Sequence, residues 1–221
     1  MKYLLIAMTL LLVSVATADW PWLENFDAYS AGTGIIGQGN WEGWGGSSAP
    51  DAYISDAQAL SAPHSLDVEP TSDVVQEFNI TEGQWVITAW HYIPSGSTGK
   101  QFFILLTLYD GTNSKWALQL KFDSDLGQLK VTEGTVTTAI IYDQWTEVKV
   151  EIDLGTSMQT ISYNGTELET IAWGTGTYIE FDALDLFSDG GSSIYWDDIS
   201  LVEIEEALAP STWAAIKTSL K

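Results

Sequence analysis

The sequence contains no cysteine and no arginine, and only two of its 221 residues are histidines, His64 and His91. Without cysteine the chain has no disulfide, no thiolate nucleophile and no cysteine-ligated zinc. Without arginine it has no bidentate clamp for a phosphate or a carboxylate. Two histidines are too few for a multi-histidine metal centre. These absences leave chemistry carried by carboxylates, hydroxyls, aromatic rings and hard cations.

Positive charge is scarce as well. The chain has 8 lysines against 30 acidic residues, which gives a net charge of −22 at pH 7. A nucleic-acid partner requires clustered basic residues that neutralise phosphates, and an anionic lipid surface has the same requirement. The charge therefore excludes general binding to nucleic acid and docking to anionic membranes.

Long apolar runs are absent except at the start of the chain. Lys2 precedes the apolar segment 3–15, and Ala16-Thr17-Ala18 has the small residues of a cleavage site. This pattern predicts a secretory signal peptide over residues 1–18. The run is shorter than the roughly 20 residues that span a bilayer. We therefore expect a secreted or cell-surface protein with no membrane span after cleavage.

Alternating apolar and polar residues predict β-strands through most of the chain. Every second residue is apolar from Lys115 to Phe122, and apolar residues alternate with charged ones from Trp145 to Leu154. This period of two is typical of half-buried strands. The turn dipeptide Asn164-Gly165 favours a hairpin between two such segments. Further strands are predicted at 65–69, 74–79, 85–93, 102–109, 127–132, 137–141, 158–163, 167–173, 178–187 and 194–203.

About a dozen short strands without a helical run predict an all-β fold, a two-sheet antiparallel β-sandwich. We expect it to form one domain over residues 19–206. The glycine-rich segment 32–51 is predicted to be a long loop pinned by its tryptophans. Residues 207–221 are predicted to be a linker and a short amphipathic helix, because their apolar residues fall on one helical face. A packed terminus and an attachment tail are both compatible with this segment.

Several motifs, in their order along the chain, resemble bacterial secreted concanavalin A-like (LamG-like) jelly-roll domains. The opening Glu24-Asn25-Phe26-Asp27 with the later Gly37-Gln38-Gly39-Asn40-Trp41 is similar to the start of such domains. Ala62-Pro63-His64-Ser65-Leu66, the strand from Trp145 to Asp153 and the closing Tyr195-Trp196-Asp197-Asp198 also resemble them. The resemblance implies a jelly roll over residues 23–204. Its members include carbohydrate-binding modules, surface proteins, glycanases and lyases, so the fold does not decide the function.

An enzymatic function has only a partial motif. Laminarinase-type jelly rolls carry Glu-x-Asp-x-x-Glu, and this chain matches it at Glu151 and Asp153 but has Thr156 at the third position. Alternation places Glu147, Glu151 and Asp153 on a polar strand face, which a solvated surface explains. The lyase relatives need arginines that the chain lacks. A divergent glycoside hydrolase using Glu147 or Glu151 is the enzymatic alternative, and two carboxylates converging in a groove would favour it.

The last predicted strand carries an acid on its apolar side. Asp197 shares its side with Ile199 and Leu201, so it is expected to point into the core. A buried, unpaired carboxylate costs several kcal/mol and needs a cation or several donors. Ca²⁺ and backbone N–H groups at a strand kink are the two alternatives. First and last strands often pair in jelly rolls, which would bring Asp27 or Glu24 near Asp197, and the resemblance implies a structural calcium there.

Aromatic rings are the remaining candidates for ligand binding, because the chain has 11 tryptophans. A flat ring can pack against the C–H face of a sugar, and this contact needs no formal charge. Trp116 is expected in the core because it alternates with Leu118 and Leu120. The candidate ligand-binding residues are Trp41, Trp44, Trp90, Tyr92 and Trp196.

The sequence thus predicts a secreted, non-catalytic jelly-roll module that binds a polysaccharide or a cell-surface glycan and carries a structural Ca²⁺. One alternative is an adhesion or structural protein without a glycan ligand. The other is the divergent glycoside hydrolase.

Overall fold

The computed structural model describes residues 21–46, 48–174 and 176–204, and within them the chain is all-β. These residues form fifteen strands and one short 3₁₀ helix, η1 (Gly111–Asn113), and they contain no α-helix. No helix in this part of the chain is long and apolar enough to span a bilayer. The predicted signal peptide and C-terminal helix lie outside the described residues.

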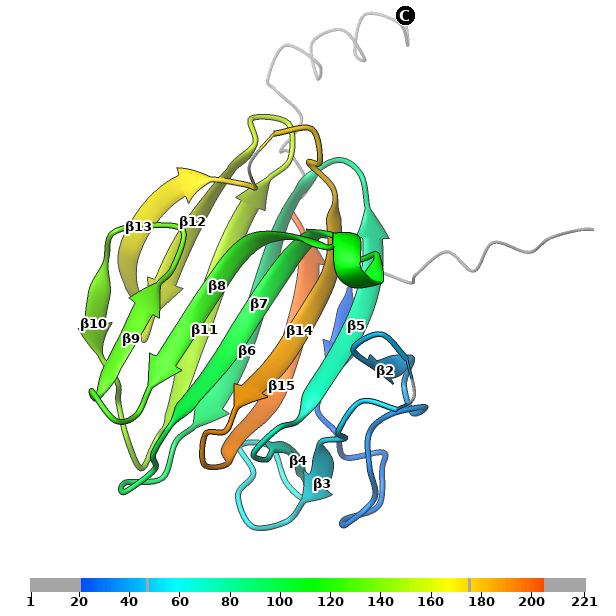
Figure 1. The fold of residues 1–221 in the computed structure, drawn as a ribbon, viewed down its shortest axis with the longest axis vertical. Coiled ribbons are helices and arrows are strands. Elements are labelled where there is room, and N and C mark those ends of the chain that lie inside the picture. The colour runs from blue at the N-terminus through cyan, green and yellow to red at the C-terminus, as the bar shows by residue number, and fades with distance from the viewer. Residues whose placement is uncertain (1–20, 47, 175, 205–221) are drawn as a thin grey trace, which may run out of the picture.

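The strands form two antiparallel sheets that pack face to face (Figure 1). Sheet A has the order β13-β12-β11-β6-β15-β4-β3, and β1 also pairs with β15. Its strands are β1 (Trp22–Glu24), β3 (Tyr53–Ser55), β4 (Ser65–Val68), β6 (Gln84–Tyr92), β11 (Trp145–Asp153), β12 (Met158–Tyr163), β13 (Thr166–Ala172) and β15 (Ile194–Glu203).

Sheet B has the order β10-β9-β8-β7-β14-β5-β2. Its strands are β2 (Trp41–Gly43), β5 (Asp73–Ile80), β7 (Lys100–Leu108), β8 (Lys115–Asp123), β9 (Gln128–Val131), β10 (Thr137–Ala139) and β14 (Phe181–Asp189). The two-sheet antiparallel sandwich predicted from the alternation is therefore confirmed.

The main core lies between the sheets, as the period of two predicts. On β11, Val148, Val150 and Ile152 are buried, while Lys149 and Glu151 on the opposite side reach solvent. The inward side chains of both sheets form one continuous apolar cluster. Burial of this apolar area is the main favourable contribution to folding, at about 25 cal/mol per Å².

The strand positions agree closely with the sequence predictions, but three strands are new. Each of the twelve predicted strands is present, with ends shifted by at most three residues. Asn164 and Gly165 both have positive φ, 48° and 72°, in the turn between β12 and β13, which is the geometry of a two-residue hairpin. The strands β1, β2 and β3 have only three residues each, too few to show a period.

Two β-bulges move tryptophans to faces that simple alternation does not predict. The pairing of β7 with β8 shifts near Leu106, so that Ala117 and Leu118 are both buried and Trp116 is 42% exposed. The prediction that Trp116 lies in the core is therefore wrong. A bulge adds one unpaired residue to a strand and so reverses the side-chain alternation beyond it.

The second bulge lies on β15, where the pairing with β6 shifts between Asp197 and Ser200. Asp198 there has a φ of 44°. As a result Trp196 and Asp197, although adjacent, are both buried, with exposed fractions of 1% and 0%. Asp197 is buried, as predicted, but it lies opposite Trp90 on the outward side of β6, so the prediction that it points into the core with Ile199 and Leu201 is wrong. Trp196, opposite His91, is the residue that faces the core.

Candidate functional site on the outer face of sheet B

The side of sheet B that faces away from sheet A, here called the outer face of sheet B, combines aromatic, apolar and acidic residues. Its side chains form three rows across β5, β14, β7 and β8. The rows are Glu77–Ala183–Leu106–Trp116, Val75–Asp185–Ile104–Gln119 and Asp73–Phe187–Phe102–Lys121. Such a mixture differs from the alternating charged residues on the solvent side of β11.

A second apolar cluster underlies this face. Val75, Ile104, Leu106 and Ala183 are at most 4% exposed, although they point away from the main core. Aromatic side chains pack over them and shield them from water: Trp44, Phe102, Tyr109 and Phe187. The face is therefore a layer of rings on an apolar base, which fixes where those rings lie.

Trp116 stacks on Trp44 at the edge of this layer. Their ring centroids are 6.4 Å apart and their planes differ by only 11°. Tyr109 packs edge-on against Trp44, with centroids 5.1 Å apart. Trp116 is 42% exposed, so part of its ring is accessible to solvent. The two stacked rings form an aromatic patch whose Trp116 side is open to solvent, called here the Trp44–Trp116 platform.

Hydrogen bonds hold Tyr109 in place after β7. Its hydroxyl accepts the N–H of Gly45 at 3.0 Å, and its own N–H donates to Oδ2 of Asp182 at 2.6 Å. The pKa of the Tyr109 hydroxyl is raised by burial and by the nearby carboxylates of Glu42 and Glu77. The ring thereby connects the loop after β2 to β7 and β14.

Asp73 and Asp185 form a hydrogen-bonded pair of carboxyl groups in this face. Asp185 is 3% exposed, and burial together with Asp73 raises its pKa well above the usual value. Burial also raises the pKa of Asp73, to about 6, although the hydrogen bond from Asp185 opposes this. Two carboxyl groups in contact cannot both ionise without strong repulsion, so they share one proton near neutral pH.

Glu42 and Glu77 form a second pair of the same kind. Burial and the hydrogen bond with Glu77 raise the pKa of Glu42 to about 7. Glu42 lies on β2 opposite Val75, and Glu77 lies on β5 opposite Ala183, so both border the same face. Together with Asp182, the two pairs place five carboxyl groups around Tyr109 and beside the Trp44–Trp116 platform.

The five predicted ligand-binding residues do not form one site. Trp41 is 1% exposed and packs in the main core against Trp22 and Phe26, so it pins the early loop from inside. Trp196 is in the core as well. Neither residue offers a ring face to a ligand, which corrects the prediction for both. Only Trp44 lies on the outer face of sheet B.

Trp90 and Tyr92 lie on the opposite side of the sandwich, on the outward side of β6 in sheet A. Tyr92 is between Trp145 of β11 and Tyr195 of β15, at centroid distances of 5.7 and 6.4 Å. These rings are tilted by 55° and 66° to one another, so they make no flat surface. Trp90 and Tyr92 remain predicted contact residues, on a face separate from Trp44.

The predicted calcium residues both hold the loop that precedes β4. Oδ2 of Asp197 accepts the N–H groups of Leu60 and Ser61 at 2.7 and 3.1 Å, and Oδ1 accepts the N–H of Asp198 at 2.7 Å. Oδ1 of Asp27 accepts the N–H of His64 at 3.0 Å. The predicted pairing of the first and last strands is present, with β1 beside β15.

These contacts match the second alternative for Asp197, backbone N–H groups at a strand kink. N–H donors occupy both oxygens of Asp197, whereas calcium needs oxygen ligands facing it. In the described part of the chain no group of three or more His, Asp or Glu residues could hold a metal ion. The donors around Asp197 therefore do not fit a calcium ion, and calcium stays a prediction from the sequence.

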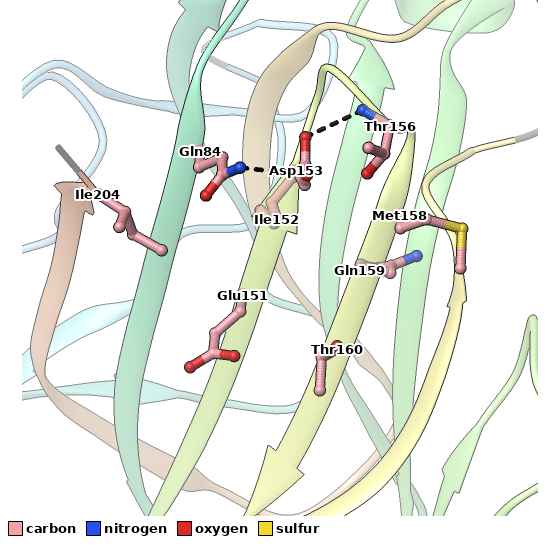
Figure 2. A pocket seen from close by; sticks show the side chains of 9 residues that line it. All are labelled: Gln84, Glu151, Ile152, Asp153, Thr156, Met158, Gln159, Thr160 and Ile204. Carbon is pink, nitrogen blue, oxygen red and sulfur yellow. Dashed lines mark hydrogen bonds between the residues drawn. The ribbon is translucent and has the colours of Figure 1, made fainter. Parts of the chain in front are cut away.

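The acidic residues of the partial glycanase motif line a pocket of about 280 Å³ on sheet A (Figure 2). Figure 2 shows the carboxylates of Glu151 and Asp153 pointing apart along β11. Asp153 accepts the N–H of Thr156 at 2.9 Å, which lowers its pKa, and Glu151 pairs with Lys149 at 2.8 Å. A retaining glycosidase needs a nucleophile and an acid whose pKa is raised, so this pocket does not favour glycoside hydrolysis.

Sequence reasoning missed Trp116, Tyr109 and the carboxyl pairs of the outer face of sheet B. One signal was present in β14, which reads Phe-Asp-Ala-Leu-Asp-Leu-Phe and is apolar on both sides. Strands of this composition are buried on both faces. Asp185 in its middle is thus a buried carboxyl, which is unusual enough to mark a site.

Similarity to solved structures supports the sandwich fold. The chain is similar to a sialidase over 84% of its length, with a TM-score of 0.57 and 10% identity, and covers 18% of that chain. It is also similar to the Trypanosoma rangeli sialidase, with a TM-score of 0.50, 12% identity, 75% of this chain and 30% of that chain covered.

A galectin of Caenorhabditis elegans is matched with a TM-score of 0.44 and 9% identity, over 62% of this chain and 96% of that chain. No protein-family model and no curated protein sequence matches the chain. At such low identity the first two matches show a β-sandwich, consistent with a jelly roll, and nothing further. The chain spans less than a third of the length of these sialidases.

Proposed function

We propose that the protein is a non-catalytic, carbohydrate-binding β-sandwich module and that its glycan lies on the outer face of sheet B. The observation that carries this proposal is the Trp44–Trp116 platform, with planes 11° apart and Trp116 42% exposed. A large ring left in water costs hydrophobic free energy, about 25 cal/mol per Å². The exposure of the Trp116 indole is therefore not explained by the stability of the fold, and a ligand that covers the ring would explain it.

The chemistry of the face suits a sugar ring. A pyranose has an apolar C–H face, which can cover an indole, and hydroxyl groups around its edge that need hydrogen-bond partners. Carboxyl oxygens of Glu42 and Glu77 beside the platform can accept hydrogen bonds from those hydroxyl groups. Binding sites of small ligands in general combine apolar walls with a few placed polar groups.

The test is retention of the whole protein on insoluble polysaccharides, followed by binding isotherms on the polymer that retains it. We expect Trp116→Ala to weaken binding at least tenfold, because it removes the exposed half of the platform. Trp90→Ala is the matched control, since it removes an indole from the outward side of sheet A. Circular dichroism spectra would show that both variants fold.

Three outcomes are distinguished by this comparison. Weaker binding only in Trp116→Ala supports the platform. Weaker binding only in Trp90→Ala would move the glycan site to sheet A. Retention on no polysaccharide would contradict the glycan-binding function and leave the adhesion or structural alternative.

We also propose that the protein is secreted or displayed at the cell surface, from the signal-peptide pattern of residues 1–18. Mass spectrometry of the exported protein should then give an N-terminus at Asp19. An N-terminus at Met1 in a protein that stays inside the cell would contradict the proposal.

A further inference from the structure

We propose that the outer face of sheet B binds uncharged glycans and rejects acidic ones. This inference rests on the proposed function and names the class of glycan that the site accepts. It follows from the distribution of charged side chains around the Trp44–Trp116 platform and from the hydrogen-bonding capacity of those side chains.

Acidic side chains border the platform on the side of β2, β5 and β14. The cross-strand pairing places Glu77 in the same row as Trp116 and places Asp185 one row further along β14. The Asp182 carboxylate is fixed beside the platform by the N–H of Tyr109, at 2.6 Å. The five carboxyl groups on this side are Glu42, Asp73, Glu77, Asp182 and Asp185.

Lysines on this face lie away from the platform. Lys121 is opposite Phe102, at the far end of the third row, and forms an ion pair with Asp123 at 3.2 Å. Lys130 lies opposite Lys121 on β9, beyond the strands that carry the platform and the carboxyl groups. Lys100 lies one row beyond Phe102, opposite Asp123 and Asp189.

One lysine, Lys115, is next to Trp116 in the sequence, and it keeps its positive charge. Its Nζ donates to the carbonyl of Asn113 at 2.8 Å. Because the chain contains no arginine, none of the carboxyl groups beside the platform has a guanidinium partner. A ligand on the platform therefore meets five carboxyl groups on one side and a single lysine, Lys115, at its other edge.

An acidic sugar and an uncharged sugar differ sharply in such a site. The carboxylate or sulfate of an acidic sugar has only acceptor oxygens, so it cannot hydrogen-bond to an ionised carboxylate and is repelled by it. The hydroxyl groups of an uncharged sugar are donors, and each can satisfy a carboxyl oxygen. The site thus selects hydroxyl-rich, uncharged sugars by charge and by hydrogen bonding together.

The experiment compares polymers that share a backbone but differ in charge. Hydroxyethyl cellulose against carboxymethyl cellulose, methyl-esterified against de-esterified homogalacturonan, and desulfated against sulfated galactan are three such pairs. Affinity gel electrophoresis or calorimetry at pH 7.5 in 50 mM NaCl would measure binding of the whole protein. For a backbone that binds, we expect the uncharged polymer to bind at least tenfold more tightly than its acidic partner.

Salt and charge-removing variants connect that difference to the named residues. In 1 M NaCl, where the Debye length is about 3 Å, the preference should shrink severalfold. Glu77→Gln should reduce it as well, because it removes a carboxylate from the face. Glu147→Gln is the matched control, since Glu147 lies opposite Trp90 in sheet A and its loss should leave the preference unchanged.

The outcomes separate this inference from the proposed function. Equal or tighter binding of the acidic polymer would overturn the inference and leave glycan binding intact. A preference for the uncharged polymer that Glu147→Gln reduces as much as Glu77→Gln would overturn the assignment to this face. Binding to no polymer of any pair would overturn both proposals.

Discussion

Replacing His91 with leucine should make the stability of the protein less sensitive to acid. His91 is 0% exposed and points from β6 into the main core. Its ring stacks on Tyr163 at 5.6 Å and contacts Phe122 and Trp196 at 4.7 and 5.5 Å. Neither ring nitrogen has a hydrogen-bond partner among the described residues. Burial without partners lowers the pKa of His91 to about 3.

The magnitude follows from the difference between the folded and unfolded states. An unfolded histidine has a pKa near 6.5, so below that pH the unfolded state binds a proton at this residue and the folded state does not. Proton binding then favours the unfolded state. Stability is therefore complete above about pH 6.5 and is lost as the pH falls towards 3. Between pH 7 and pH 5 the loss amounts to about 2 kcal/mol, from the linkage relation. Leucine does not bind a proton in either state, so the His91→Leu variant does not lose this stability at low pH.

The assay is urea denaturation of both proteins, followed by tryptophan fluorescence, at pH 7 and pH 5. The free energy of unfolding of His91→Leu, minus that of the parent protein, should rise by about 2 kcal/mol between the two pH values. Differences in packing add a constant that cancels in this comparison. Ile87→Val, in the same strand, is the control and should shift both values equally. A pH-independent difference for His91→Leu would refute the reasoning.

Three further predictions concern the carboxyl groups and a turn. EDTA should change the melting temperature by less than about 1 °C, because N–H groups already bind both carboxylate oxygens of Asp197; a larger fall would support a bound calcium ion. Below about pH 4 Asp185 is protonated in both the folded and the unfolded state, so its raised pKa costs no stability there. Above that pH the unfolded state ionises first, and the fold loses stability as the pH rises towards the pKa of the folded Asp185. Asp185→Asn should therefore raise the melting temperature more at pH 8 than at pH 5, and the reverse order would contradict the shared proton with Asp73. Gly165→Ala should cost about 1 kcal/mol in urea denaturation, since Gly165 has a φ of 72°; no cost would argue against this turn.

Local patterns were sufficient to predict most strands. The alternation from Trp145 to Leu154 needed only the period of two, because one side of β11 faces the core along its whole length. The hairpin at Asn164-Gly165 likewise depends on two residues whose backbone preferences are local. The three-residue strands β1 to β3 could not be predicted in this way, since pairing with distant strands is what makes them strands.

The candidate site could be predicted only in part. Trp44 was among the candidates because it lies in a glycine-rich segment, but Trp41 in the same segment is buried in the core. Trp116 was missed because a bulge reverses its direction relative to Leu118. The pairing of Asp73 with Asp185 joins residues more than 100 positions apart, and no local pattern carries that information.

The amino-acid sequence by itself determined the fold class, the strands and the excess of negative charge, because periodicity and composition are properties of neighbouring residues and of the whole chain. The exposure of each tryptophan and the sharing of protons between carboxyl groups were decided only by the tertiary structure. The reason is physical: bulges set the direction of Trp116 and Trp196, and contacts between strands distant in sequence bring Asp73 to Asp185 and Glu42 to Glu77.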